Sequence, residues 1–285
     1  MLNDDSVFNI RSVLVSDRTR IANLIHFGTY VHQHLDWMSP IEWIGKQPYL
    51  VIENREGILA TLACPPDLPE ITWIRLFAVS SSINIEKAWS LLWNAIRNEF
   101  LQKKKIHVVA LSTQSWFTAI LESSKFTQTD NVIILINERS TDIREPNPIS
   151  IKIRQMMPED LPVVLDIDNT AFDLEWRNSI SAMELAFQQS SYTTIAEMDG
   201  EIVGYQYSTS SGMGGHLARL AVKASMQKNG IGYSLVHDVL KHFRQQGVIN
   251  ITVNTQQSNI ASLGLYAKAG FTTTGESYRV YQTFL

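Results

Sequence analysis

The stretch SMQKNGIGYSLVHDVLKHF, residues 225–243, places Gly230 and Gly232 one residue apart directly before an amphipathic helix. The apolar residues of that helix recur at helical spacing: Ile231, Leu235, Val239 and Phe243. The first N–H groups of a helix have no partner inside it, and the helix dipole is positive there. Glycines let an anion approach these amides closely, so the stretch predicts a phosphate site, although glycine also serves as an ordinary helix cap.

The bulk composition is typical of a globular protein of about two domains: 285 residues, 45% hydrophobic and 18% charged. The formal net charge is −4 and the pI is about 6.0, so nucleic acid is not expected as a partner. Apolar runs such as VIILI (132–136) are too short to cross a bilayer, and the N-terminus lacks an apolar signal region. We therefore expect a cytoplasmic protein that does not contact a membrane.

The chain contains two copies of one unit. NIRSVLVSDRTRIANLI begins at Asn9 and KIRQMMPEDLPVVLDI begins at Lys152, and each passes from a strand-like run through an acidic residue into a helical pattern. The offset is 154 − 11 = 143 for the arginines and 160 − 17 = 143 for the aspartates. Such self-similarity predicts a tandem repeat.

The repeat continues along both halves. YLVIENREGILATL (49–62) and TTIAEMDGEIVGYQ (193–206) both predict β-hairpins, and each is followed by a strand, a long helix and a further strand. The polar stretch NERSTDIREPNP (137–148) separates the copies as a linker. We expect domains at 1–140 and 149–285.

Residues 151–285 resemble the GNAT superfamily of acyl-CoA-dependent N-acetyltransferases. LAVKASMQKNGIGYSLV (220–236) is similar to the family's strand–turn–(Gln/Arg)-x-x-Gly-x-(Gly/Ala)–helix motif, and NTQQSNIASLGLYAKAGF (254–271) to its later Asn…Ala…Leu-Tyr…Gly-Phe motif. The repeat extends the resemblance to the first half. It implies an α/β (α+β) chain of two tandem GNAT folds, each a mixed, mostly antiparallel sheet flanked by helices.

The resemblance also implies how acetyl-CoA binds. Its pyrophosphate would lie on the amides of the glycine loop, and its pantetheine arm would pair with the strand before that loop, where the strand splays from the next one. The implied binding residues are Leu220, Ala221, Val222, Gln227, Lys228, Asn229, Gly230, Ile231, Gly232, Asn259 and Ser262. Asn259, Ser262 and Tyr266 share one helix face, which would look onto the coenzyme, while Ile260, Leu263 and Ala267 would look into the core.

Two side chains are candidates for the chemistry. Tyr266 matches the family tyrosine that protonates the departing thiolate, and a tyrosine is protonated at neutral pH as a general acid must be. The alternative is a packed aromatic ring whose hydroxyl only binds the coenzyme. His216 resembles a histidine near the central strand of arylalkylamine acetyltransferases and could remove the amine proton, or it is an exposed histidine after a glycine-rich turn. Asn254 stands where some relatives carry a glutamate base, so the base stays open between His216 and an ordered water chain. Asp173 and Glu175 could attract a cationic amine or form a solvated helix surface.

The first copy lacks these features. Its counterpart of the glycine loop, SSINIEK (81–87), has no glycine, Leu121 stands in place of Tyr266, and Lys125 in place of Gly270. We therefore predict that the N-terminal copy does not catalyse. Trp89 and Trp93, at helical spacing, are expected in a core or domain interface.

The leading hypothesis is an N-acetyltransferase that moves acetyl from acetyl-CoA to a primary amine of a small molecule or protein N-terminus, with only the C-terminal copy active. The alternative is an acyl-CoA-binding sensor or pseudo-enzyme without transfer. No metal is expected, because His32 and His34 have no identifiable third or fourth ligand. Apart from the amine acceptor, a second copy of the chain in a homodimer is left open as a partner.

Overall fold

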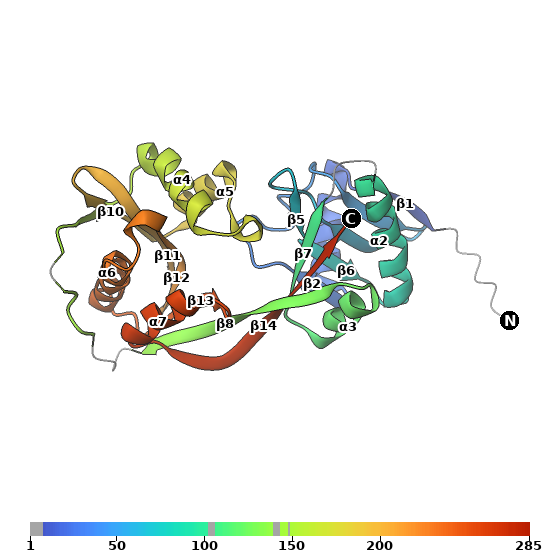
Figure 1. The fold of residues 1–285 in the computed structure, drawn as a ribbon. Coiled ribbons are helices and arrows are strands. Elements are labelled where there is room, and N and C mark those ends of the chain that lie inside the picture. The colour runs from blue at the N-terminus through green and yellow to red at the C-terminus, as the bar shows by residue number, and fades with distance from the viewer. Residues whose placement is uncertain (1–7, 102–105, 139–142, 148) are drawn as a thin grey trace. The chain divides into compact units, whose positions relative to one another are not determined.

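The computed structural model describes residues 8–101, 106–138, 143–147 and 149–285 of the chain (Figure 1). It divides into two compact units: unit 1 comprises Met1–Thr129 and Arg279–Leu285, and unit 2 comprises Asp130–Tyr278. These units and the expected sequence domains, 1–140 and 149–285, divide the chain differently at their ends. Of the expected linker 137–148, Asn137 and Glu138 belong to strand β8 (Thr127–Glu138), whereas residues 139–142 and 148 lie outside the described residues.

Unit 1 contains a five-stranded sheet in the order β1-β3-β4-β6-β2. Its strands are β1 (Asn9–Ser12), β2 (Tyr30–Gln33), β3 (Tyr49–Glu53), β4 (Ile58–Ala63) and β6 (Leu76–Val79). A second group pairs β5 (Ile71–Trp73) with β7 (His107–Ser112), and β7 with the last residues of β14 (Thr272–Phe284). The final strand of the sequence thus completes unit 1.

Helices cover both faces of the five-stranded sheet. Helix α1 (Arg18–Phe27) packs on one face, and α2 (Ile85–Leu101) packs on the other in one core with α3 (Ser115–Ser123). Strand β3 shows why: Tyr49 and Val51 belong to the core on the α1 side, whereas Leu50 and Ile52 belong to the core on the α2 side. Successive strand side chains point to opposite faces, so a continuous apolar run is buried on both.

Unit 2 is built on the strand order β14-β8-β13-β12-β11-β10-β9. Its strands, besides parts of β8 and β14, are β9 (Lys152–Gln155), β10 (Tyr192–Met198), β11 (Glu201–Ser211), β12 (Gly214–Val222) and β13 (Asn250–Gln256). The pair β12–β13 is parallel, and the pairs β13–β8, β12–β11, β11–β10 and β10–β9 are antiparallel. The predicted mixed, mostly antiparallel sheets and both predicted hairpins are confirmed.

The helices of unit 2 also lie on both faces of its sheet. Helix α6 (Ile231–Gln245) packs against β10, β11 and β12, and α4 (Leu161–Ala171) contacts β11 and β12 together with α5 (Ile180–Gln189). Figure 1 shows α6 and α4 on opposite sides of these strands. Helix α7 (Ile260–Lys268) contacts α6. Within the described ranges, no helix has the length and apolar character needed to cross a bilayer.

Each unit begins with the same ion-paired clamp. In unit 1, Arg11 bonds Asp17 at 2.6 Å and Glu53 at 2.7 Å, and the Asp17 carboxylate also accepts the N–H of Leu14 at 2.9 Å. In unit 2, Arg154 bonds Asp160 at 2.7 Å and Glu197 at 2.8 Å, and Asp160 accepts the N–H of Met157 at 2.8 Å. The arginine therefore joins the first strand, the following 3-10 turn and the neighbouring strand in both units.

We predict that Asp17→Asn lowers the free energy of unfolding of unit 1 by about 2 kcal/mol at neutral pH. The hydrogen bond from Arg11 lowers the pKa of Asp17 from 3.8 to about 2. A lowered carboxyl pKa contributes stability above the unfolded value, and that contribution is lost as the pH falls from about 4 to about 2. Six of the seven tryptophans lie in unit 1, so denaturant titrations followed by tryptophan fluorescence at pH 7 and pH 2.5 measure the difference.

The matched control for this test is Glu56→Gln, which changes an exposed carboxylate in the β3–β4 turn of the same unit. Its unfolding curve should follow the native protein at both pH values. A deficit in Asp17→Asn that persists undiminished at pH 2.5 would show that the clamp does not depend on the aspartate charge.

Candidate active site in unit 2

The site is organised by a change of pairing in the middle of β12. Residues Gly214 to Leu217 pair with Asn250 to Val253 of β13, and the pairing of these two strands ends there. At the same point the register with β11 shifts: Tyr207 faces Arg219, whereas Ser208 faces Leu217, so Ala218 is an extra residue on β12. A bulge of this kind bends its strand and re-aims the backbone. Residues 219–222 therefore continue alongside β11 only, and the predicted splay is present.

The splay leaves part of the β12 backbone open. The N–H of Lys223 bonds Val203 of β11 at 2.8 Å, and hydrogen-bonded pairs alternate along an antiparallel ladder. The N–H groups of Ala221 and Arg219 therefore point to β11, and those of Leu220 and Val222 point to the side that β13 has left. Of the three backbone positions expected to meet the coenzyme, the amide of Ala221 is thus committed to the sheet.

The glycine loop follows β12 directly. Ala224–Met226 form a 3-10 turn, and Lys228 and Gly230 take positive φ values of 64° and 86°. The N–H of Ser234 bonds the carbonyl of Gly230 at 3.0 Å. The N–H groups of Ile231 and Gly232 precede this first helical bond and face the N-terminal end of α6, where an anion is favoured.

Two loop side chains and one glycine hold the loop in place. Gln227 Nε2 donates to the carbonyl of Val222 at 3.2 Å, and Asn229 Nδ2 donates to Met226 at 3.3 Å. A Cβ on Gly232 would lie 3.3 Å from Leu265 of α7 and 3.7 Å from Val222. Gly232 therefore lets the start of α6, the end of β12 and α7 pack closely. The sequence had suggested two other roles for this glycine, phosphate approach and an ordinary helix cap.

Helix α7 differs at two positions from the burial expected from the sequence. Asn259 caps the helix, since its side chain accepts the N–H of Ser262 at 3.0 Å. Tyr266 is buried, but Ile260 is 74% exposed and Ala267 is also exposed, so the expectation that they look into the core was wrong. The face that carries Asn259, Ser262 and Tyr266 is the one turned toward the protein.

Tyr266 lies in the core between α6 and α7. Its ring makes an edge contact with Phe271 at 5.6 Å between centroids. Burial raises the pKa of its hydroxyl above the ordinary value of 10. The hydroxyl therefore keeps its proton at neutral pH.

His216 stands beside the splay, in the part of β12 that pairs with β13. Its Nδ1 lies 2.9 Å from Thr252 Oγ1, and the Thr252 hydroxyl is placed to donate to Gly215 at 3.3 Å. Thr252 then accepts from Nδ1–H, which leaves the lone pair on Nε2. Burial lowers the pKa of this imidazole below 6.5, so the ring is neutral at pH 7.

Sequence analysis missed a buried ion pair on the opposite face of β12 from α6. Arg219 Nε bonds Asp168 of α4 at 2.5 Å, and its Nη2 bonds the carbonyl of Trp176 at 2.6 Å. Asp168 also accepts from the Tyr205 hydroxyl and from the N–H of Asn178. The pair ties α4 and the segment after it to β12. Each residue of the pair left a signal in the sequence, because each is a charged residue within an otherwise apolar run: Asp168 in VVLDID and Arg219 in LARLAV.

The remaining candidates are more peripheral. Asp173 is exposed at the start of a 3-10 turn (Leu174–Trp176), and Glu175 within that turn is half-buried. Asn254 is exposed on β13. Among the residues that the structure describes, no group of three or more His, Cys, Asp or Glu side chains could hold a metal ion.

In unit 1 the equivalent strand edge is closed. Strand β6 carries Ala78 and Val79, the counterparts of Ala221 and Val222, and pairs with β4 on one side. On its other side it pairs with β2, from Tyr30 opposite Val79 to Gln33 opposite Leu76. The pairing of β2 with β6 was not predicted from the sequence, where the run YVHQ has no counterpart in the second copy.

Comparisons with known proteins agree with this arrangement. Residues 165–281 match the family model described as an acetyltransferase (GNAT) domain. An uncharacterized N-acetyltransferase of Methanocaldococcus jannaschii is 27% identical over 120 residues, which cover 42% of this chain and 76% of that protein. One of Bacillus subtilis is 40% identical over 55 residues, which cover 19% of this chain and just 36% of the relative's length.

Solved structures match the chain over its length. A tandem GNAT protein from the clavulanic acid biosynthesis pathway superposes with a TM-score of 0.66 at 11% identity, covering 98% of both chains. A GCN5-related N-acetyltransferase from Sphaerobacter thermophilus gives 0.64 at 16% identity, covering 97% of this chain and 95% of that one. At these identities the likeness establishes the fold. The chain thus carries a GNAT-family N-acetyltransferase domain in its C-terminal half, within a fold that it shares with tandem GNAT proteins.

Proposed function

We propose that the protein transfers acetyl from acetyl-CoA to a primary amine, of a small molecule or a peptide N-terminus, and that unit 2 performs the reaction. One observation carries the proposal: the β12 edge is open beside a glycine loop with free helical amides. The equivalent edge of unit 1 is filled by β2. This contrast supports a catalytic unit 2 and a unit 1 that does not catalyse.

The residues of unit 2 fit the donor. The N–H groups of Leu220 and Val222 would hold the pantetheine arm, and the amides of Ile231 and Gly232 would hold the pyrophosphate, with Lys228 exposed nearby. Acetyl-CoA supplies the activated thioester when it is bound. Asn259 and Ser262 would lie against it from α7.

Two protons have to move, and two side chains are suited to them. Tyr266 holds its proton because burial disfavours the phenolate, so it would donate to the thiolate that leaves. His216 is neutral and has its Nε2 lone pair available, so it would accept a proton from the amine. Asp168 is already bonded to Arg219, Tyr205 and Asn178, and it would position α4 instead of acting as a base.

The second candidate is a sensor that binds acyl-CoA without transfer, which the asparagine at position 254 favours. In a sensor the Tyr266 hydroxyl has no chemical task. The two functions therefore differ in what removal of that hydroxyl does.

We expect acetyl-CoA and free CoA to bind the native protein with micromolar affinity and the Gly230→Glu variant to lose this binding, as measured by isothermal calorimetry. A carboxylate at this position would repel the pyrophosphate. Because Gly230 has a φ of 86°, the variant also strains the backbone. Gly247→Glu is the control, since Gly247 has a φ of 85° at the other end of α6 and a Cβ there meets open space. Equal affinities in all three proteins would argue against the loop as the site.

Tyr266→Phe should reduce kcat about 100-fold and leave the dissociation constant of acetyl-CoA unchanged, because it removes a general acid but keeps the ring. The measurement is thiol release with a panel of amines, next to calorimetry. Tyr233→Phe is the matched control, since Tyr233 belongs to the same core but its hydroxyl donates to the backbone carbonyl of Arg144 at 2.7 Å. A native protein that binds acetyl-CoA and acetylates no amine in the panel would support the sensor.

His216→Asn should abolish the acidic limb of the kcat/KM profile and lower its plateau. Asparagine keeps a donor for Thr252 but has no counterpart of Nε2. The neutral ring is the active form, and its pKa is lowered, so native activity should fall only below about pH 6.5. A profile that keeps its shape and height in the variant would assign the base to another group.

A further inference from the structure

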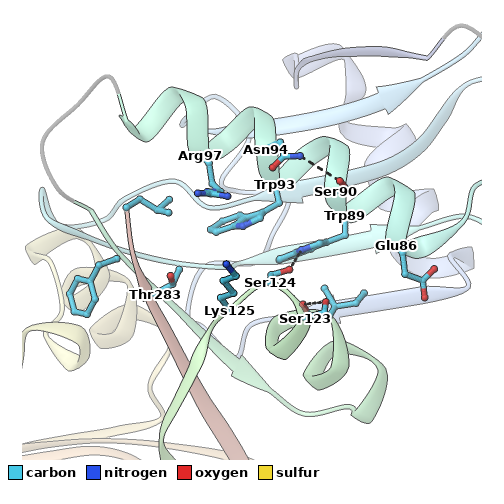
Figure 2. Close-up of a pocket in the computed structure, with 13 residues that line it drawn as sticks. Glu86, Trp89, Ser90, Trp93, Asn94, Arg97, Ser123, Ser124, Lys125 and Thr283 are labelled. Atoms are coloured by element: carbon cyan, nitrogen blue, oxygen red, sulfur yellow. Dashed lines mark hydrogen bonds between the residues drawn. The ribbon is translucent and has the colours of Figure 1, made fainter.

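Unit 1 contains a pocket that has no role in the acetyl transfer proposed above. It has a volume of about 480 Å³ and is lined by α2, by the turn after α3 and by the last residues of β14 (Figure 2). All of its lining residues belong to unit 1. A volume of this size suits a small organic molecule.

The floor of the pocket is aromatic and rigid. Trp89 and Trp93, buried in the core as predicted, stack with their centroids 5.5 Å apart and an angle of 17° between the rings. Trp89 Nε1 donates to Ser124 Oγ at 2.6 Å, which fixes α2 to the turn after α3. The apolar residues Ile120 and Phe284 also line the pocket. Such flat surfaces favour a planar ligand.

The rim of the pocket carries two cations, Arg97 and Lys125. Within the described ranges, neither Arg97 nor Lys125 forms an ion pair, and both are exposed. In Figure 2 the Lys125 side chain points from the turn toward Trp93, and Arg97 lies beyond that ring on α2. Glu86 lines the pocket about 16 Å along the helix from Arg97, since eleven residues at 1.5 Å each separate them. Positive charge therefore gathers at one end.

The backbone at Lys125 is unfavourable for a lysine. Its φ is 63°, in the left-handed region, and the equivalent residue in unit 2 is Gly270 with a φ of 81°. Glycine is the residue that favours this position after a helix. Unit 1 thus holds a lysine in a strained conformation at the mouth of a pocket, and such strain is concentrated at functional sites.

We propose that this pocket binds a small planar aromatic anion, with its ring against the tryptophans and its carboxylate or phosphate between Lys125 and Arg97. Both cations can then form charge-assisted hydrogen bonds with the anion. This pocket lies in unit 1, where β2 closes the β6 edge that corresponds to the proposed acetyl-CoA site. The ligand would therefore not be the acetyl donor, and it would regulate or accompany the transfer.

The test uses 1-naphthyl phosphate as the probe and its neutral parent 1-naphthol as the comparison. The full chain is titrated with each, and binding is followed by calorimetry and by quenching of tryptophan fluorescence. The phosphate should bind at least tenfold more tightly than the naphthol. Equal binding of the two, or no binding of the phosphate, would overturn the proposal.

Three variants assign the site. Lys125→Gly should weaken binding of the phosphate about tenfold while raising the melting temperature, because it removes the cation and the backbone strain together. Arg97→Gln should weaken binding similarly, with no change in melting temperature. Arg55→Gln, an exposed arginine in the β3–β4 turn, should change neither. Unchanged affinity in both pocket variants would place the probe elsewhere and refute the site, even if the native protein binds it.

Discussion

Strand β6 of unit 1 and strand β12 of unit 2 each precede the main helix of their unit. One edge of each strand is paired with the preceding hairpin strand, β4 or β11, and the structure depends on what pairs with the other edge. A buried backbone N–H or C=O needs a partner, and an open strand edge attracts one. In unit 1 that partner is β2, which pairs with β6 from Tyr30 to Gln33. In unit 2 the bulge at Ala218 coincides with the end of the pairing with β13, so the amides of Leu220 and Val222 face a side without a neighbouring strand. The same local scaffold is thus closed in one unit and open in the other.

What both copies retain is the part that stabilises the scaffold. The clamp from Arg11 to Asp17 and Glu53 recurs from Arg154 to Asp160 and Glu197 with nearly identical bond lengths. The two copies differ in the residues around this strand edge: the glycine loop, the seventh residue of the short helix, and the second residue after that helix. The residues that stabilise the scaffold and the residues proposed to bind a ligand are therefore different residues of one repeat.

Local patterns in the sequence predicted the local elements well. Hairpins, the amphipathic helices 85–101 and 231–245, and the glycine loop follow from periodicity and from the backbone freedom of Gly230. Pairings between distant segments were not predicted, because the sequence of a four-residue strand such as β2 does not indicate which strand it pairs with. Likewise Asp168 and Arg219 are 51 residues apart, and each alone is only a misplaced charge. The exposed Ile260 shows that a short helix with apolar residues all around does not reveal its buried face.

The open edge also has a thermodynamic consequence for unit 2. Unpaired amides at Leu220 and Val222 forgo the hydrogen bonds that β2 supplies to β6, each of which is worth about 1 kcal/mol net. A ligand that binds only the folded unit restores that stability by mass action, about 2.7 kcal/mol when its concentration is 100 times its dissociation constant. Unit 1 has this stabilisation built into its chain through β2. A duplicated fold can therefore close this strand edge with its own chain in one copy, while the open edge of the other copy would gain stability from any ligand that pairs with it.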